Sequence, residues 1–189
     1  MKVTSHASTS PNLHLLHDHE ELDKLLKKLE QALAGDDLKA SHALLDLFWA
    51  RLAVHIRAEH LHLFPLVVKG IAERDGSGEV SLSQAESIIA ELRADHDFFM
   101  HELAQAVAVL RELKPTDGER VKERMNDVHE VVLSIAERLL THNSIEEERV
   151  YLWASMFLSE QEQKELATRI TEELVNRPAR FSSESWSRR

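Results

Sequence analysis

The scarcity of helix-breaking residues is the feature that most limits the folds open to this chain. The 189 residues include only five glycines and four prolines, and none of these lies between Gly118 and Leu158. Aromatic residues, which strands favour, make up 5% of the chain. Glycine and proline interrupt helices, and the turns between short strands need them often. The sequence therefore predicts long helices and argues against a fold rich in β-strands.

Leucine-rich patterns at helical spacing mark the first two helices. The pattern predicts one helix over residues 12–34, and Gly35 ends it. Apolar positions then recur from Leu38 to Pro65 and predict a second helix. Because proline lacks an amide hydrogen and clashes with the preceding turn, the second helix is expected to kink or stop there, with room for a further turn or two.

Capping boxes mark where the later helices begin. In this motif a serine or threonine and an acidic residue three positions on satisfy the first free amide groups of a helix. The pairs are Ser83 with Glu86, Thr116 with Glu119, and Ser159 with Glu162. They predict a third helix that ends near Leu113, a fourth that continues to Leu158, and a shorter fifth.

Four long helices joined by short loops are expected to pack as antiparallel neighbours. The predicted fold is therefore all-α: an up-down-up-down antiparallel four-helix bundle with an additional C-terminal helix against its outside or one end. The bundle and the fifth helix are expected to form one domain over residues 12–175. Residues 1–11 are expected to be a disordered N-terminus, and residues 176–189, which lack periodicity, a mobile tail.

Composition excludes several classes of partner and of metal site. The net charge of −10 offers no broad basic surface for phosphate backbones or anionic lipid heads, so neither nucleic acid nor a membrane is an expected partner. No stretch approaches the ~20 apolar residues of a membrane span, and the N-terminus has no apolar run of signal length, which predicts a cytoplasmic protein. Because the chain has no cysteine, any metal must be held by nitrogen and oxygen atoms, and the 12 histidines are conspicuous.

A histidine followed four residues later by a glutamate occurs twice in the predicted bundle. The pairs are His55 with Glu59 in the second helix and His142 with Glu146 in the fourth. Residues four apart on a helix differ by about 40° in direction, so the two side chains of each pair project from nearly the same face.

The first and third predicted helices each carry a histidine in a matching context. Each of these histidines follows an aspartate, and the pairs are Asp18 with His19 and Asp95 with His96. They precede the histidine of the next helix by 36 and 46 residues, which suits partners at one depth of a helical hairpin. The chain is therefore interpreted as two similar helix pairs.

Four histidines and two glutamates that converge inside a bundle need a compensating partner. Burying an unpaired carboxylate costs several kcal/mol, and each imidazole needs partners for its ring nitrogens. Two cations, each bound by two of the histidines and sharing the glutamates, would supply that compensation and leave coordination positions open. Imidazole and carboxylate ligands without thiolate suit iron, manganese, zinc or copper rather than calcium or magnesium.

At these residues the sequence resembles the hemerythrin-like, or HHE cation-binding, family. Successive helices in that family carry a histidine, a His-x-x-x-Glu motif, a histidine and a second His-x-x-x-Glu motif. The resemblance covers residues 12–158, and the letters HLFP after Glu59 are similar to the family's Leu-Phe-Pro ending. It implies a non-haem di-iron centre of two iron ions, Fe2+ or Fe3+, with a bridging oxygen species, while manganese and zinc stay alternatives. The implied metal ligands are His19, His55, Glu59, His96, His142 and Glu146, with the two glutamates bridging.

The implied ligand set is more similar to that of sensor and iron-handling relatives than to that of oxygen carriers. Oxygen-carrying hemerythrins have a second histidine four residues from the first on the third helix, and here Leu92 and Met100 stand at the two such positions. They also carry an aspartate on the fourth helix where this chain has a glutamate. A ferritin-like site would need Glu-x-x-His on two helices, and only Glu59 to His62 matches.

Other polar residues near these motifs are expected to play lesser roles. His60 is expected behind the ligands or at the surface. His62 returns to the face of His55 and is a candidate gate, extra ligand or hydrogen-bond donor. His101 would need a distorted helix to reach a metal, and Tyr151 is expected to form a hydrogen bond at the end of the bundle, with a redox role as an alternative.

The leading hypothesis is a small di-iron protein that binds or reacts with O2, NO or peroxide. The expected partner is therefore a small diatomic ligand or peroxide. The alternative is an iron, oxygen or redox sensing module whose metal occupancy controls bundle stability and the binding of a protein partner. A metal-free bundle that serves only in protein interactions is a third hypothesis. The sequence leaves open whether the protein is an enzyme and how many chains associate.

Overall fold

The structure, a computed structural model, describes residues 11–74 and 80–176, and no strand occurs within these ranges. The prediction of an all-α protein is confirmed. The helices are α1 (Pro11–Ala34), α2 (Leu38–Ala58), α3 (Phe64–Glu73), α4 (Leu82–Glu112), α5 (Glu119–Ile145), α6 (Tyr151–Phe157) and α7 (Glu160–Val175). Apart from Pro11 and Asn176, the predicted disordered N-terminus and mobile tail lie outside the described residues.

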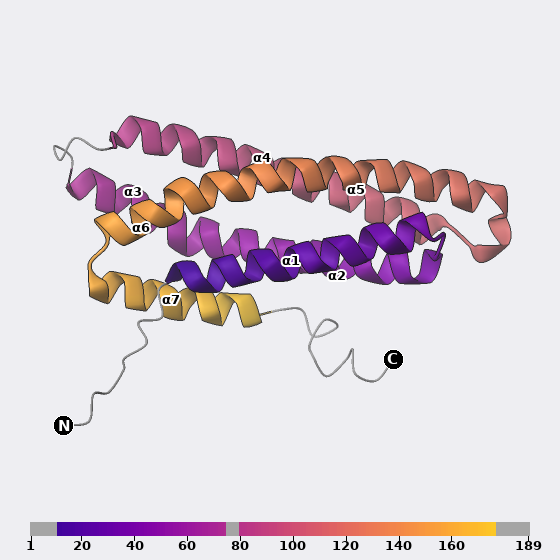
Figure 1. Ribbon diagram of the computed structural model, residues 1–189, viewed down its shortest axis with the longest axis horizontal. Coiled ribbons are helices and arrows are strands. Elements are labelled where there is room, and N and C mark those ends of the chain that lie inside the picture. Colours follow the sequence, from indigo (N-terminus) through magenta and orange to yellow (C-terminus); the bar gives the residue numbers. More distant parts are fainter. Residues whose placement is uncertain (1–10, 75–79, 177–189) are drawn as a thin grey trace, which may run out of the picture.

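Four long helices, α1, α2, α4 and α5, lie side by side along the molecule (Figure 1). In Figure 1, α1 and α4 run from left to right, and α2 and α5 run back. The helix α1 packs against α2 and α5, and α4 packs against the same two helices, so the four enclose a shared interior. The C-terminal helix α7 lies along the outside of α1 and α2. No helix among the described residues is long and apolar enough to cross a membrane.

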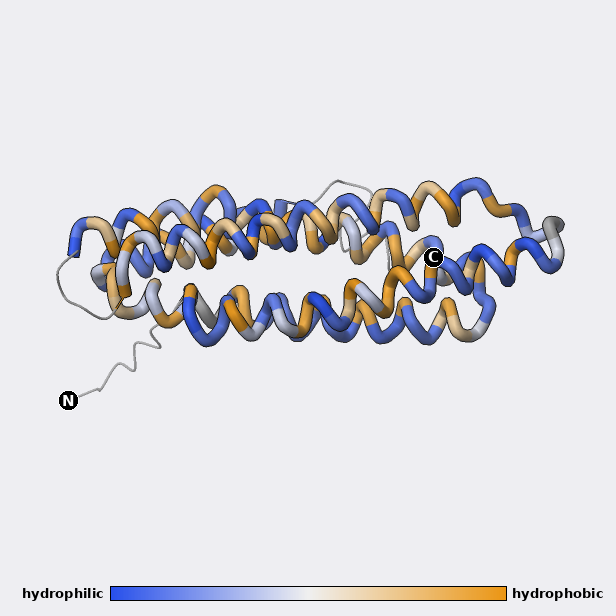
Figure 2. The backbone as a smooth tube through the Cα atoms, turned by 90° about the horizontal axis from the view of Figure 1, so that it is seen from above, coloured by the Kyte–Doolittle hydropathy of each residue, from blue (hydrophilic) through white to orange (hydrophobic). Residues whose placement is uncertain are grey.

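The interior consists of two apolar clusters with a polar layer between them. One cluster gathers buried residues of α1, α2, α4 and α5, among them Leu29, Phe48 and Val128. The other, at the α3 and α6 end, includes Phe64 and Trp153. Hydrophobic and hydrophilic residues are interspersed along the long helices (Figure 2), as expected where each helix buries one face. The layer between the clusters holds the residues that the sequence singled out.

Of the three predicted capping boxes, one begins two residues earlier than expected, one is absent and one is present as predicted. The third helix starts at Ser81, whose side chain accepts the amide hydrogen of Gln84, and not at Ser83. The pattern of serine followed by Glu or Gln occurs twice in that segment, and the earlier copy caps the helix. The fourth helix has Gly118 as its N-cap, with φ 58°, and no side-chain cap, so Thr116 does not cap it. Because glycine adopts a positive φ more readily than other residues, Gly118 can form the turn that leads into α5. The box at Ser159 is confirmed.

The second helix does not stop at Pro65. A π-helical turn over Glu59–Leu63 joins α2 to α3, and the amide of Phe64 donates to the carbonyl of Glu59, five residues back. A second π-helical turn, Glu146–Val150, joins α5 to α6, and the amide of Tyr151 donates to the carbonyl of Glu146. In an α-helix a residue five positions on lies about 140° around the axis, whereas a π turn brings it back above the first. Each glutamate therefore begins an irregular turn that brings the aromatic residue five positions later, Phe64 or Tyr151, back to the face of the glutamate.

Candidate metal centre

The six residues predicted to meet in the bundle lie together at one level of its interior. They come from α1, α2, α4 and α5 and from the first position of each π-helical turn. All six are buried, with at most 4% of any one exposed to solvent. They are His19, His55, Glu59, His96, His142 and Glu146. Their ligand-type atoms form two groups within 4.8 Å, one of His19, His55, Glu59 and Glu146 and one of His96, His142 and Glu146.

The histidines form two pairs that face each other through the same ring nitrogen. The Nε2 atoms of His19 and His55 are 3.1 Å apart. Those of His96 and His142 are 2.9 Å apart. Each pair joins the two halves of one helical hairpin, as the sequence spacing predicted. Two pairs of imidazole nitrogens thus converge on the polar layer.

The two glutamates lie between these pairs, and each turns one oxygen to each pair. Glu59 Oε1 is 3.3 Å from His55 Nε2, and its Oε2 is 3.4 Å from His96 Nε2. Glu146 Oε2 is 3.4 Å from His19 Nε2, and its Oε1 is 3.2 Å from His142 Nε2. A carboxylate arranged in this way can bridge two metal ions, each of which would also take two histidines.

Three of these carboxylate oxygens have no hydrogen-bond partner among the described residues, although they are fully buried. They are Glu59 Oε2 and both oxygens of Glu146. Leaving a buried carboxylate oxygen unsatisfied is costly, and buried charges are normally paired or bound to a metal. The donor set of imidazole nitrogens and carboxylate oxygens therefore fits a metal ion, and these orphaned oxygens are the observation that tests the fit.

The pKa values show how the metal-free cluster divides its charge. Burial, with the neighbouring His142, lowers the pKa of His96 to about 2, so this ring is neutral and its nitrogen is free to coordinate. Burial alone would raise the pKa of Glu146, but His142 and His19 hold it well below its usual range. Burial raises the pKa of Glu59, and repulsion from Glu146 adds to the rise. A cation between the two carboxylates would allow both to ionise.

Asp18 orients the ring of His55 from behind. Its Oδ2 accepts from His55 Nδ1 at 3.1 Å, and its Oδ1 accepts from Arg51 at 2.6 Å. Burial alone would raise the pKa of Asp18, but His55 and Arg51 lower it to about 2. In the neutral ring, a carboxylate on Nδ1 leaves Nε2 as the unprotonated nitrogen that can bind a metal.

The other half of the cluster repeats this arrangement. Asp95 accepts from His142 Nδ1 at 3.2 Å and from Arg138 at 2.7 Å. Both aspartates stand in the sequence motifs without a predicted role, and Arg51 and Arg138 were not predicted to belong to the site. A signal was present, because each arginine stands four residues before the histidine of a His-x-x-x-Glu motif and so lies on the same helix face.

The remaining candidates divide between the cluster and the surface. His60 is half-buried, and its Nε2 shares a hydrogen bond with His96 Nδ1 at 2.9 Å, so it lies directly behind one of the clustered histidines. His62 lies 3.6 Å from Glu173 of α7 and takes no part in the cluster. His101 is exposed, and its side chain forms a hydrogen bond with that of Gln105. Tyr151, expected to form a hydrogen bond at the end of the bundle, belongs to the apolar cluster at the α3 and α6 end, and its hydroxyl donates to Glu59 of the buried cluster.

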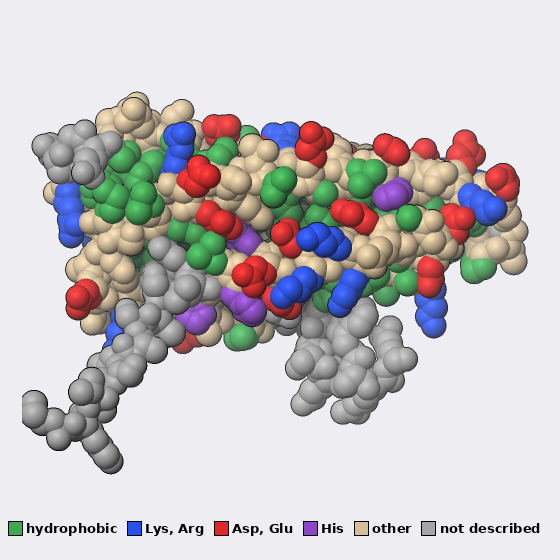
Figure 3. Space-filling model, in the orientation of Figure 1, with side chains coloured by type: hydrophobic (Ala, Val, Ile, Leu, Met, Phe, Trp, Pro, Cys, Tyr) green, Lys and Arg blue, Asp and Glu red, His purple; other side chains and the backbone are tan. Residues whose placement is uncertain are grey.

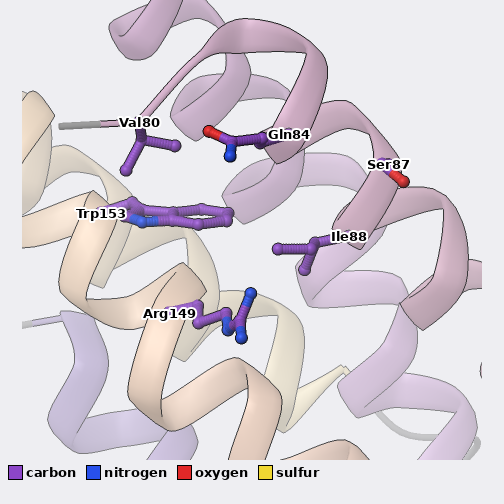
Figure 4. A pocket seen from close by; sticks show the side chains of 6 residues that line it. All are labelled: Val80, Gln84, Ser87, Ile88, Arg149 and Trp153. Carbon is purple, nitrogen blue, oxygen red and sulfur yellow. The ribbon is translucent and has the colours of Figure 1, made fainter. Parts of the chain in front are cut away.

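The surface offers no comparable group of ligands in the part of the chain that the structure describes. Acidic and basic side chains are intermixed on the face seen in Figure 3. A separate surface cavity lies where the start of α4 meets α6, and the side chains of Trp153 and Arg149 line it together with Ile88 (Figure 4). None of the residues that line this cavity belongs to the buried cluster.

The fold and the site define a class of protein: an all-helical protein whose interior gathers imidazole and carboxylate groups that could hold a metal ion. Comparison with protein families makes the class specific. Residues 10–154 match the family described as the hemerythrin HHE cation-binding domain, and the chain belongs to that family. The match spans all six clustered residues and leaves α7 outside. Neither the curated proteins nor the solved structures contain a match to this chain.

Proposed function

We propose that this protein holds two iron ions in the buried cluster and uses them to bind or react with O2, NO or peroxide. The observation that carries the proposal is the placement of the glutamates. Each buried carboxylate divides its two oxygens between two pairs of histidines, and three of the four oxygens accept no hydrogen bond among the described residues. This arrangement suits two cations better than one.

In this proposal His19 and His55 hold one ion, His96 and His142 hold the other, and the two glutamates bridge them. Bound iron could change between the ferrous and ferric states, and it would offer a coordination position to a small molecule. Asp18 and Asp95 fix which nitrogen of the paired histidines faces inward. The apolar clusters on either side exclude bulk water from the site. Iron is chosen over manganese and zinc on the family relationship.

The proposed function is tested by metal content and by visible spectra. Freshly purified protein is expected to contain two irons per chain. Addition of O2, NO or peroxide to the anaerobic ferrous protein is expected to change its visible spectrum within the mixing time. A protein without bound metal would refute the proposal, and two irons that respond to none of the three molecules would favour the sensing function below. Consumption of peroxide by the wild type, absent in His96→Ala, would establish an enzyme.

A second candidate function is sensing, and the position of α7 favours it. This helix contacts the π-helical turn that begins at Glu59, as well as α1 and α2. Arg57, two residues before Glu59, forms an ion pair with Glu173 of α7 and donates to the carbonyl of Asn176. A change of metal state at Glu59 would therefore reach α7 through a short path. Faster amide exchange in α7 after removal of the metal would support this function, and equal exchange would contradict it.

The buried aspartates are expected to tune metal affinity without binding the metal. In Asp18→Asn the hydrogen bond to His55 can persist, but the charge that pairs with Arg51 is lost. Loss of such outer partners typically weakens metal binding by about 10–100-fold. A competition titration with a chelator measures the change. Asp127→Asn, which removes an exposed carboxylate paired with Arg124, is the matched control and should leave the affinity unaltered.

The finer features of the fold belong to the same proposal. We assign an up-down-up-down topology to the four long helices, with residues 12–175 as one domain. The order of contacts among α1, α2, α4 and α5 supports this assignment. The cytoplasmic location that the composition indicates stays a prediction.

A further inference from the structure

The two halves of the cluster are arranged alike, but two positions that contact the cluster carry different residues in the two halves. Counting from each glutamate, the next residue is His60 in one half and Glu147 in the other. The fifth residue is Phe64 in one half and Tyr151 in the other. Both pairs lie in or directly after the π-helical turns, which aim the fifth residue at the cluster. The two proposed metal positions therefore have different surroundings.

Around His19, the differing residues supply oxygen atoms. The Tyr151 hydroxyl oxygen is 3.2 Å from His19 Nε2 and 3.3 Å from Glu59 Oε1. These separations match those among the proposed ligand atoms of this half, which range from 3.1 Å between His19 and His55 to 3.4 Å between His19 and Glu146. The phenol is buried, with 2% of the residue exposed. Its oxygen thus lies among the donor atoms and not behind them.

The carboxylate of Glu147 adds to this difference. Glu147 Oε1 accepts from His19 Nδ1 at 2.9 Å, so a negative charge supports the ring from outside. A carboxylate partner raises the basicity of a metal-binding imidazole. In the half that contains Tyr151, the carboxylate of Glu147 therefore also makes His19 the stronger donor to a metal.

Around His96, the differing residues supply no oxygen. The ring of Phe64 stacks on His96, with ring centres 6.0 Å apart and planes 10° apart. Phe64 has no donor atom to offer a metal. The outer nitrogen of His96 meets His60, an uncharged partner when its ring is neutral, in place of a carboxylate. This half contributes two histidines and the shared glutamates, and an apolar ring stands where the other half has a hydroxyl.

We infer that the two metal positions are unlike: Tyr151 is a further ligand of the ion held by His19 and His55, and the ion held by His96 and His142 keeps the open position where the small molecule binds. This inference rests on the proposed function. The first ion would take five protein donors, from His19, His55, Glu59, Glu146 and Tyr151. The second would take four. Coordination breaks the O–H bond of the phenol, and the proton passes to solvent as the metal–oxygen bond forms.

The test uses the fact that Tyr151 is the only tyrosine in the chain. Metal-free protein is reconstituted with iron, oxidised to the ferric state, and examined by visible absorption and resonance Raman spectroscopy. The expected result is a phenolate-to-iron charge-transfer band with enhanced tyrosine ring vibrations. Tyr151→Phe should retain two irons per chain and lose both signals. In the wild type, a chelator should remove one iron more slowly than the other, and Tyr151→Phe should bring the two rates together.

The outcomes separate this inference from the proposed function. Two bound irons with no phenolate band in the wild type would show that Tyr151 only donates a hydrogen bond to Glu59, which overturns the inference and leaves the proposed function intact. Wild-type protein that takes up no iron would overturn both. Phe64→Tyr provides a second variant, because a hydroxyl in the other half should add a second phenolate and slow the binding of NO.

Discussion

Glu146→Ala is expected to abolish the binding of both metal ions. Glu146 belongs to both ligand groups of the cluster, and its two oxygens face His19 in one half and His142 in the other. The expected loss of affinity exceeds the roughly 100-fold that is found when merely an outer partner of a metal ligand is removed. Elemental analysis of the purified variant, followed by a metal titration of the apoprotein, measures the effect.

A neighbouring glutamate supplies the control for this variant. Glu148 lies in the same π-helical turn, but its side chain is exposed and it belongs to neither ligand group. Glu148→Ala should keep both metal equivalents. The circular dichroism of Glu146→Ala should remain helical, because the two apolar clusters do not include this residue. Retention of two metals by Glu146→Ala would remove the central support for a bridged site.

Removal of the metal is expected to lower the melting temperature strongly. Without a cation, two carboxylates are buried close together, and three of their oxygens accept no hydrogen bond from the part of the chain that the structure describes. A ligand present at about 1,000 times its Kd stabilises the folded state by about 4 kcal/mol. In a chain of this size each kcal/mol shifts the melting temperature by roughly 2–4 °C. The apoprotein should therefore melt about 8–16 °C below the iron-loaded protein in a calorimetric or circular dichroism scan.

The same scan includes its own control. Chelator should leave the melting temperature of Glu146→Ala unaltered, because that variant has no metal to lose. Refilling the wild-type apoprotein with iron should restore the original value. Equal melting temperatures for the apo and iron-loaded wild type would mean that the cluster binds no ion in the folded state, and they would favour the metal-free interaction bundle.

The meeting of the six residues was predictable because it depends on local periodicity and on hairpin geometry. The four-residue step from His55 to Glu59 places both side chains on one helix face, and the step from His142 to Glu146 does the same. The distance along the chain to the histidine of the preceding helix then sets a common depth. The structure brings these side chains together, and their role as ligands stays a prediction until the metal is measured.

Other features of the site were hidden because they arise from contacts between helices. The hydrogen bond from Arg51 to Asp18 joins residues 33 positions apart in the sequence. That from Arg138 to Asp95 joins residues 43 apart. The four-residue step from each arginine to the next histidine places it on the face of a His-x-x-x-Glu motif. Because charged residues make up 30% of the chain, that step alone does not distinguish these arginines from those of a solvated helix face. Only packing shows that these two neutralise buried aspartates.

The start of the fourth helix shows the limit of local signals. Thr116 and Glu119 have the spacing of a capping box, but the chain turns at Gly118 instead. Pro115–Asp117 forms a 3-10 turn ahead of the helix. A short motif competes with the geometry that the connection between α4 and α5 must adopt, and a glycine at positive φ prevails over a side-chain cap here.

The sequence by itself determined an all-helical chain, the two similar helix pairs and the set of side chains that converge between them, because helical periodicity and breaker residues act within one or two turns. Only the tertiary structure decided which ring nitrogens face the carboxylates and which residues support them. It also decided that Tyr151 reaches the cluster, because a π-helical turn after Glu146 rotates the rest of the helix. The sequence carries no clear local signal for such a turn.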